Sequence, residues 1–233
     1  MTPPNDRAVV LASGGMDSAT AAYEAQARGY DELYLLHTSY GQNTEKREYE
    51  CASVLAEHVE AANFCHVETS HLQQIGGSSL TDDEMAVAEA DTESDEIPSS
   101  YVPFRNANLL SMAVSYAEAN DCAAVFIGAH SEDFSGYPDC RPAFFEAFQQ
   151  VVDVGTKPET DISLVAPFVE WAKTDIAERG LDLGVPYEDT WSCYRSDEPA
   201  CGTCDACAFR LNAFQALGER DPIEYERRPD HTV

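Results

Sequence analysis

The sequence predicts an α/β fold with an open, mostly parallel sheet, helices on both faces and a small cysteine-rich element at the C-terminal end. Apolar segments of strand length alternate with helical segments over most of the chain, which is the pattern of βαβ units. A glycine-rich loop joins the first strand to the first helix. After Val185, tyrosine, tryptophan, cysteine, proline and glycine crowd together without a period. We therefore expect residues 1–184 to form one α/β domain and residues 185–233 to form the appended element and a closing helix.

Five short apolar runs have the length of strands that are buried on both faces. The expected strands are Ala8–Ala12, Leu33–His37, Phe64–Glu68, Ala123–Gly128 and Ser163–Phe168. The segments around them have helical spacing of apolar residues. The expected helices are Asp17–Arg28, Glu45–Ala61, Asn106–Ala119, Pro142–Val154, Lys173–Arg179 and the closing helix Ala208–Leu217. The acidic segment Thr81–Glu96 lacks this periodicity, so we interpret it as a solvated loop, with a lid over the site as the alternative.

Acidic residues dominate the charge of the chain. It contains 42 aspartate and glutamate residues against 14 lysine and arginine residues, a formal net charge of −28. We interpret this as adaptation to a high-salt cytosol, because the Debye length falls to about 3 Å at 1 M salt. The charge argues against direct nucleic-acid binding, which needs a basic surface, and favours a small-molecule substrate. Neither a long apolar run nor a secretory signal is found, so we expect a cytoplasmic protein without membrane contact.

The segment Ser13–Ser18, with the sequence Ser-Gly-Gly-Met-Asp-Ser, lies between the first strand and the first helix. Backbone N–H groups and the helix dipole can hold an anion there, and Asp17 implies a metal ion between itself and a phosphate. It is not a Walker loop, because Asp17 occupies the position of the lysine. A plain glycine turn capped by Asp17 or Ser18 is the structural alternative. The loop resembles the SGGxDS signature of the PP-loop ATP pyrophosphatases, which implies a Rossmann-like fold, ATP binding and adenylation of a substrate oxygen. The residues expected to bind the nucleotide are Leu11, Ala12, Ser13, Gly14, Gly15, Met16, Asp17, Ser18 and Ala19.

Four of the eight cysteines fall within fifteen residues, at Cys193, Cys201, Cys204 and Cys207. Three of them are spaced three residues apart, so they can converge on one tetrahedral ion with Cys193 as the fourth ligand. A cytosolic chain keeps its thiols reduced, which argues against disulfides. We interpret the group as a structural zinc site with one ion per chain. An iron–sulfur cluster is the main alternative, and four unrelated core thiols are the other.

Three further segments lie at predicted strand ends or loops, where a parallel sheet lines its ligand crevice. They are Tyr40–Gln42, Val102–Asn106 and Asp133–Arg141. Taken singly, each can be an ordinary turn or a helix start. The third segment combines two aspartates, an arginine, a serine and two aromatic residues, which suits a flat heteroaromatic ligand.

Together these motifs resemble the 7-cyano-7-deazaguanine synthase family. The resemblance rests on the glycine loop, Tyr-Gly-Gln, Val-Pro-x-Arg-Asn, Asp-Phe-Ser-Gly-Tyr-Pro-Asp-Cys-Arg, the Pro-x-x-x-Trp-x-Lys that ends at Lys173, and the Thr-x-Cys-Tyr from Thr190 that leads into the cysteines. It covers nearly the whole chain, from about Val9 to Arg210. One departure is Phe104, where the family usually has glycine.

The resemblance implies that ATP and magnesium are used to adenylate 7-carboxy-7-deazaguanine, that ammonia displaces AMP to give the amide, and that a second adenylation leaves the nitrile. Asp17 and Ser18 would act with the loop on the phosphates. Arg105, Arg141 and Lys173 are candidates for pairing with the substrate carboxylate or phosphate. Asp133 and Asp139 are candidates for binding the guanine-like edge or taking a proton from ammonium. His37 and His130 end strands and could contact the nucleotide, but we interpret them as satisfied loop histidines.

The expected product is a precursor of archaeosine or queuosine, and the salt signature favours archaeosine. A homodimer is expected from the resemblance alone. Two other functions remain open at this stage. One is a PP-loop enzyme that modifies tRNA directly, for which the charge is unfavourable and Cys140 would be a candidate thiol. The other is a nucleotide-binding regulatory module with a zinc knuckle for a protein partner.

Overall fold

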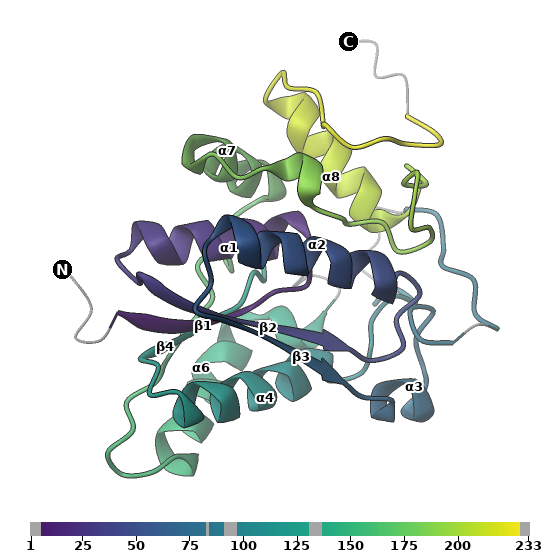
Figure 1. Ribbon diagram of the computed structural model, residues 1–233. Helices are drawn as coiled ribbons and strands as arrows, with labels where there is room; N and C mark the ends of the chain where they lie inside the picture. Colours follow the sequence, from purple (N-terminus) through teal and green to yellow (C-terminus); the bar gives the residue numbers. More distant parts are fainter. Residues whose placement is uncertain (1–5, 83, 91–96, 131–136, 229–233) are drawn as a thin grey trace.

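A computed structural model describes residues 6–82, 84–90, 97–130 and 137–228 of the chain (Figure 1). Five parallel strands form one sheet in the order β3-β2-β1-β4-β5. The strands are β1 (Arg7–Leu11), β2 (Glu32–Ser39), β3 (Asn63–Glu68), β4 (Ala124–Phe126) and β5 (Ser163–Val165). The predicted parallel α/β fold is therefore confirmed. The strand order changes direction between β1 and β4, so a crevice is expected at their carboxyl ends.

Helices cover both faces of the sheet (Figure 1). One face carries α1 (Met16–Ala27), α2 (Glu45–His58), α7 (Lys173–Leu183) and α8 (Asp205–Ala216), and the other carries α4 (Arg105–Ala119) and α6 (Pro142–Gly155). Side chains of β1 alternate between the two faces, as the pleat of a strand requires. Ala8 and Val10 pack in the core below α1 and α2, whereas Val9 and Leu11 pack with residues of α4 and α6. The first strand is thus buried on both sides, as its continuous apolar run predicts.

Several boundaries differ from those predicted. β5 ends at Val165, and Phe168 instead forms an isolated bridge with His130. The helix predicted to end at Arg179 continues to Leu183, and the closing helix begins at Asp205, before the predicted Ala208. The short helix α3 (His71–Ile75) and the 3₁₀ turns η1 (Pro138–Cys140) and η2 (Tyr187–Asp189) were not predicted. Segments of three to five residues are too short to show a hydrophobic period, which explains why they were missed.

The C-terminal segment is fixed to the α/β body by a buried ion pair. Arg210 of α8 is 0% exposed and binds both carboxylate oxygens of Asp221, at 2.8 and 3.0 Å. Its guanidinium also donates to the hydroxyl of Thr190 and to the carbonyl oxygen of Tyr187. The ion pair thereby joins α8, η2 and the segment after α8. None of the helices in the described part of the chain combines the length and apolar character needed to cross a membrane.

Candidate functional site

The glycine loop lies at the carboxyl end of β1 and leads directly into α1. Gly14 has a positive φ of 82°, and a Cβ at this position would lie 2.3 Å from the carbonyl oxygen of Glu48. Only glycine fits there without moving α2. The hydroxyls of Ser13 and Ser18 lie 3.1 Å apart, and the Gly15 N–H donates to the Ser13 oxygen at 3.3 Å. The loop therefore places serine hydroxyls and the free N–H groups of a helix start together, which is an arrangement suited to phosphate.

Asp17 is held beside two basic side chains. Lys173 Nζ, from the first turn of α7, lies 2.5 Å from Asp17 Oδ2, and His130 Nε2 lies 3.3 Å from the same Nζ. Gly128, after β4, permits this approach, because a Cβ there would lie 2.7 Å from the main chain of Asp17. The other carboxylate oxygen of Asp17, Oδ1, is buried and has no hydrogen-bond partner among the described residues. Such an oxygen is a suitable ligand for magnesium.

The sequence reasoning placed Asp17 and Lys173 in the site, and the structure brings them into contact. It did not place His130 there. His130 lies after β4 and is 2% exposed. Its place at the carboxyl end of a strand is the sequence signal that could have assigned it to the site. His37, by contrast, donates through Nδ1 to the carbonyl oxygen of Ala12, 2.8 Å away. Burial lowers the pKa of His37 to about 4, so its ring is neutral near pH 7.

A cavity of about 530 Å³ opens beside the glycine loop. Its volume lies in the range of small-molecule sites. Its wall is formed by the glycine loop and the start of α1, the ends of β2 and β4, the starts of α2, α4 and α7, parts of the segments 80–99 and 137–140, and the C-terminal element. Residues that contribute side chains or main chain to its wall include Ser13, Gly15, Asp17, Ser18, Tyr40, Gln42, Thr44, Glu48, Arg105, Asn106, His130, Tyr137, Lys173, Trp191, Tyr194 and Phe209.

Two of the predicted substrate segments meet in this cavity. Arg105, the first residue of α4, donates through Nη1 to the hydroxyl of Tyr40 at 3.3 Å. Tyr40 follows β2, so the hydrogen bond joins the segments Tyr40–Gln42 and Val102–Asn106. Tyr137 also lines the cavity and stacks on Tyr101 with ring centroids 5.8 Å apart. Aromatic rings and one guanidinium thus share a wall, as a flat anionic ligand requires.

The residues of the predicted segment Asp133–Arg141 differ in their relation to the cavity. Asp133 lies outside the described residues, as do the three residues after it. Asp139 is buried, and its carboxylate accepts the main-chain N–H of Asn106 at 2.8 Å. Asp139 therefore satisfies the start of α4 and is not among the residues that line the cavity. Arg141 is exposed at the start of α6 and does not line the cavity either. The catalytic roles expected for these residues stay predictions.

Phe104 precedes α4 in a left-handed conformation with φ of 58° and is 61% exposed. Glycine adopts this conformation without steric cost, whereas a residue with a side chain pays about 1 kcal/mol or more. This explains why a family with this loop favours glycine at the position. The ring of Phe104 packs edge-on against Phe144, with centroids 6.3 Å apart. Arg105, the next residue, lines the cavity.

Glu48 is a site residue that the sequence reasoning missed. It lies on the same face of α2 as the buried residues Cys51, Ala52 and Leu55, and is itself partly buried. Its carboxylate accepts the Thr44 hydroxyl at 2.8 Å and the Gln42 side-chain amide at 3.1 Å. Burial raises the pKa of Glu48 to about 7. The signal was present in the sequence, because a glutamate at i, i+3, i+4 and i+7 spacing from apolar residues falls on the buried face of a helix.

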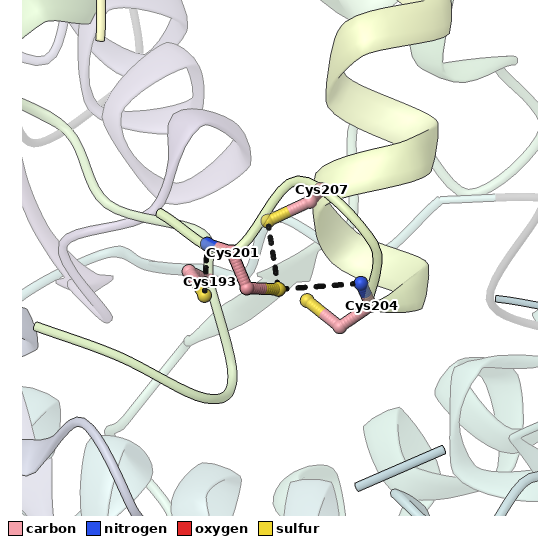
Figure 2. A group of neighbouring side chains, drawn as sticks. All are labelled: Cys193, Cys201, Cys204 and Cys207. Atoms are coloured by element: carbon pink, nitrogen blue, oxygen red, sulfur yellow. Dashed lines mark hydrogen bonds between the residues drawn. The ribbon is translucent and has the colours of Figure 1, made fainter. Parts of the chain in front are cut away.

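The four cysteines predicted to bind metal converge in the C-terminal element (Figure 2). All four are buried, and their sulfurs lie within 4.8 Å of one another. A tetrahedral ion with metal–sulfur distances of about 2.3 Å places its sulfurs about 3.8 Å apart, so the group fits one metal ion. Hydrogen bonds from Cys204 and Cys207 lower the pKa of Cys193, and its sulfur in turn raises the pKa of both neighbours. Ionising all four thiols therefore requires a cation among them.

The cysteine element also builds part of the cavity wall. The Trp191 N–H donates to the carbonyl oxygen of Gly14 at 2.8 Å. The Thr44 hydroxyl lies 3.1 Å from the carbonyl oxygen of Cys193, and the Asn43 amide donates to that of Tyr194 at 3.3 Å. Arg47 lies over the ring of Trp191. The cysteine element and the glycine loop are thus parts of one structure.

Comparisons with known proteins agree with this site. Residues 7–218 match the family model described as queuosine biosynthesis protein QueC. The chain is 84% identical over 225 residues to the 7-cyano-7-deazaguanine synthase of Haloarcula marismortui, with 97% of both chains covered. It is 76% identical to the synthase of Halobacterium salinarum, with 97% of this chain and 98% of the other covered. Among solved structures, NMN synthetase from Francisella tularensis has a TM-score of 0.50 and 18% identity, covering 93% of this chain and 79% of that one. This last likeness confirms the Rossmann-like fold.

Proposed function

The chain belongs to the queuosine biosynthesis protein QueC family, and on this premise we propose that it converts 7-carboxy-7-deazaguanine, ammonia and ATP into 7-cyano-7-deazaguanine. One observation carries the proposal. The glycine loop, Lys173 and the Arg105–Tyr40 pair face a single cavity large enough for a small substrate beside a nucleotide. A site of this form can hold a planar acid against the α-phosphorus of ATP.

In the proposed reaction the substrate carboxylate attacks the α-phosphorus and releases pyrophosphate. Ser13, Ser18 and the N–H groups at the start of α1 bind the phosphates, and Lys173 offsets the negative charge that develops there. Magnesium bound at Asp17 Oδ1 would neutralise further phosphate charge. Ammonia then displaces AMP and gives the amide. The amide oxygen is adenylated in the same way, and loss of AMP leaves the nitrile.

Arg105 is proposed to bind the substrate near its carboxylate, because it is the arginine that the described structure places in the cavity wall. Its hydrogen bond to Tyr40 fixes the guanidinium beside an aromatic surface. Tyr137, Trp191 and Phe209 contribute further rings to the wall, and we propose that the deazaguanine ring stacks among them. Guanidinium and rings together select a flat acid over an aliphatic one.

We propose that the four cysteines hold one structural zinc ion. All four ligand positions are taken by protein thiols, so no coordination site is left for a substrate. The role of the ion would be to fix the segment from Trp191 to Cys207, which carries the contact to Gly14. An iron–sulfur cluster would give visible absorbance in anaerobically purified protein. Its appearance, with iron in place of zinc on metal analysis, would overturn the zinc assignment.

The experiment that tests the function uses substrate labelled with ¹⁸O in both carboxylate oxygens. The protein is incubated in high salt with ATP, magnesium, ammonium and this acid, and the products are analysed by mass spectrometry. Two AMP molecules should form per nitrile, and each should carry one ¹⁸O, because both oxygens leave on phosphorus. Unlabelled AMP, or AMP release that needs tRNA in place of the acid, would contradict the proposal. An Asp17→Ala variant should lose AMP formation.

The acidic composition and the two relatives from Haloarcula and Halobacterium fit a protein that works in high salt. We therefore propose a cytoplasmic enzyme whose product leads to archaeosine, without direct nucleic-acid binding. The division into residues 1–184 and 185–233 and the homodimer stay predictions. Size-exclusion chromatography with light scattering in molar KCl would determine the oligomeric state.

A further inference from the structure

We infer that Glu48 is the residue that binds ammonium in this cavity and accepts its proton as nitrogen attacks the adenylated acid. The inference rests on the proposed function and deepens it, because that function needs ammonia to be released from ammonium next to the activated carboxyl. Ammonium has no lone pair with which to attack. A base positioned in the cavity therefore has to remove a proton first.

The location of Glu48 meets the requirement. Glu48 lies against the glycine loop, because its main-chain carbonyl oxygen occupies the space that a Cβ at Gly14 would fill. Its carboxylate lines the cavity together with Gln42 and Thr44, which follow β2. The glycine loop before α1 and Arg105 at the start of α4 line the same cavity as Glu48. A nitrogen held at Glu48 is thus next to the place where phosphate and carboxylate are expected to meet.

Among the described residues the Glu48 carboxylate has no direct ion pair, although the charge of Arg105 acts on it from a distance. Its two hydrogen-bond donors, the hydroxyl of Thr44 and the amide of Gln42, are both neutral. Within the described part of the chain, Glu48 forms no ion pair with lysine, arginine or histidine. A partly buried carboxylate held only by neutral donors is costly, and a small cation from solution would offset that cost. Ammonium has the size, charge and four N–H donors for this position.

The hydrogen bonds around Glu48 suit both protonation states. The Thr44 oxygen lies 2.8 Å from Glu48 Oε1 and 3.1 Å from the carbonyl oxygen of Cys193, but it has a single proton to donate. When Glu48 is ionised, Thr44 donates to the carboxylate. When Glu48 is protonated, it can donate to Thr44, which then donates to the Cys193 carbonyl. A proton can therefore arrive at the carboxylate without leaving an unsatisfied group.

Other carboxylates of the cavity are less suitable. Asp17 is paired with Lys173. Glu89 is exposed, so ammonium there would stay hydrated. Asp205 lies in the first turn of α8, where the helix dipole favours the ionised form and weakens the base. Asp139 accepts the Asn106 N–H and does not line the cavity. Among the described cavity carboxylates, Glu48 combines partial burial with hydrogen bonds from neutral donors.

The proton balance is complete for both rounds. In the first round ammonium gives one proton to Glu48, and the nitrogen lone pair forms the C–N bond. The bond between the acyl carbon and the AMP oxygen breaks, and its electrons leave with AMP. The nitrogen then loses a second proton to AMP or water, which gives the amide. Glu48 returns its proton to water. In the second round, adenylation of the amide oxygen releases one N–H proton to water, and Glu48 takes the last N–H proton as the C–O bond to AMP breaks and the nitrile forms. One base beside the same nitrogen thus serves both steps.

The test separates adenylation from the nitrogen step by comparing Glu48→Gln with a matched control, Glu50→Gln. Glu50→Gln removes the same charge from the same helix. Glu50, however, is exposed and forms ion pairs with Lys46 and Arg47. Exchange of labelled pyrophosphate into ATP, with the deazaguanine acid and without ammonium, reports adenylation alone. Glu48→Gln should retain this exchange within a few-fold and lose amide formation from ammonium by about 100-fold or more. Glu50→Gln should retain both.

Hydroxylamine provides the readout that a purely structural role would not move. It is neutral near pH 7 and needs no prior deprotonation, so Glu48→Gln should still form the hydroxamate at close to the wild-type rate. Equal loss of hydroxamate and amide, or undiminished amide formation, would overturn the inference while leaving the proposed function intact. Absence of exchange in the wild type would overturn both. If Glu48→Gln does not fold, Glu48→Asp, which keeps a carboxylate, is measured instead, and it should lose more activity with ammonium than with hydroxylamine.

Discussion

The main-chain N–H of Trp191 donates a 2.8 Å hydrogen bond to the carbonyl oxygen of Gly14. Trp191 lies two residues before the first cysteine of the metal group, and Gly14 is the tightest point of the nucleotide loop. The segment that leads into the cysteine group therefore contacts the glycine loop directly. We expect this contact to couple the stability of the cysteine group to nucleotide binding.

Loss of the metal should weaken nucleotide binding as well as the fold. A Cys204→Ser variant removes one of the four ligands, so it should lose most of its metal and unfold at a lower temperature. Because the Trp191–Gly14 contact then loses its support, ATP should bind about tenfold more weakly, which is about 1.4 kcal/mol. Metal analysis, thermal unfolding and ATP titration check this. Cys122→Ser, at a buried cysteine outside the group, should retain metal and ATP affinity.

Replacing Gly14 by alanine should lower stability far more than the same replacement at a glycine that also has a positive φ but has open space around it. Gly14→Ala meets both the left-handed conformation and the Glu48 carbonyl oxygen, whereas Gly218 has φ of 71° and nothing within 4 Å of a new Cβ. Gly218→Ala should cost about 1 kcal/mol, a few degrees in melting temperature. Gly14→Ala should cost clearly more and abolish pyrophosphate exchange. Equal melting temperatures for the two variants would show that the loop tolerates a side chain.

The glycine loop and the cysteine group were predictable because each is a local pattern whose spacing carries its own geometry. The parallel sheet followed from apolar runs such as that of β1. Glu48, His130 and Gly128 were missed for a different reason. The helical spacing around Glu48 and the place of His130 after a strand were local signals, but the roles of all three arise where α2, β4 and α1 approach one another, and no single segment shows that approach. Asp139 shows the reverse case, because a polar residue in a motif rich in polar groups was expected in the site but satisfies the start of α4.

Salt should stabilise this protein. With a net charge of −28, the folded chain repels itself, and added ions screen that repulsion. The melting temperature should therefore rise by many degrees between dilute buffer and molar KCl. KCl is preferred to sulfate for this measurement, because sulfate stabilises proteins in general through exclusion from their surface. A melting temperature indifferent to KCl would remove the high-salt interpretation while leaving the site unaffected.

The final prediction concerns pH and Glu48. Burial raises the pKa of its carboxyl from 4.5 to about 7, against the opposing hydrogen bonds of Thr44 and Gln42 and the charge of Arg105, while Glu45 on the same helix raises it further. Tyr40, the remaining titratable neighbour, stays neutral in this range because burial raises its pKa.

Since the unfolded carboxyl ionises near 4.5 and the folded one near 7, the folded state binds the extra proton. Its stability is therefore retained below about pH 4.5 and lost as the pH rises to 7, by about 3 kcal/mol at most. Glu48→Gln removes this loss, so the difference in unfolding free energy between variant and wild type should grow in favour of the variant from pH 4.5 to 7 and level off above it. Denaturant titrations in molar KCl at several pH values measure that difference, and a difference independent of pH would mean that the carboxyl is not held in a dry environment.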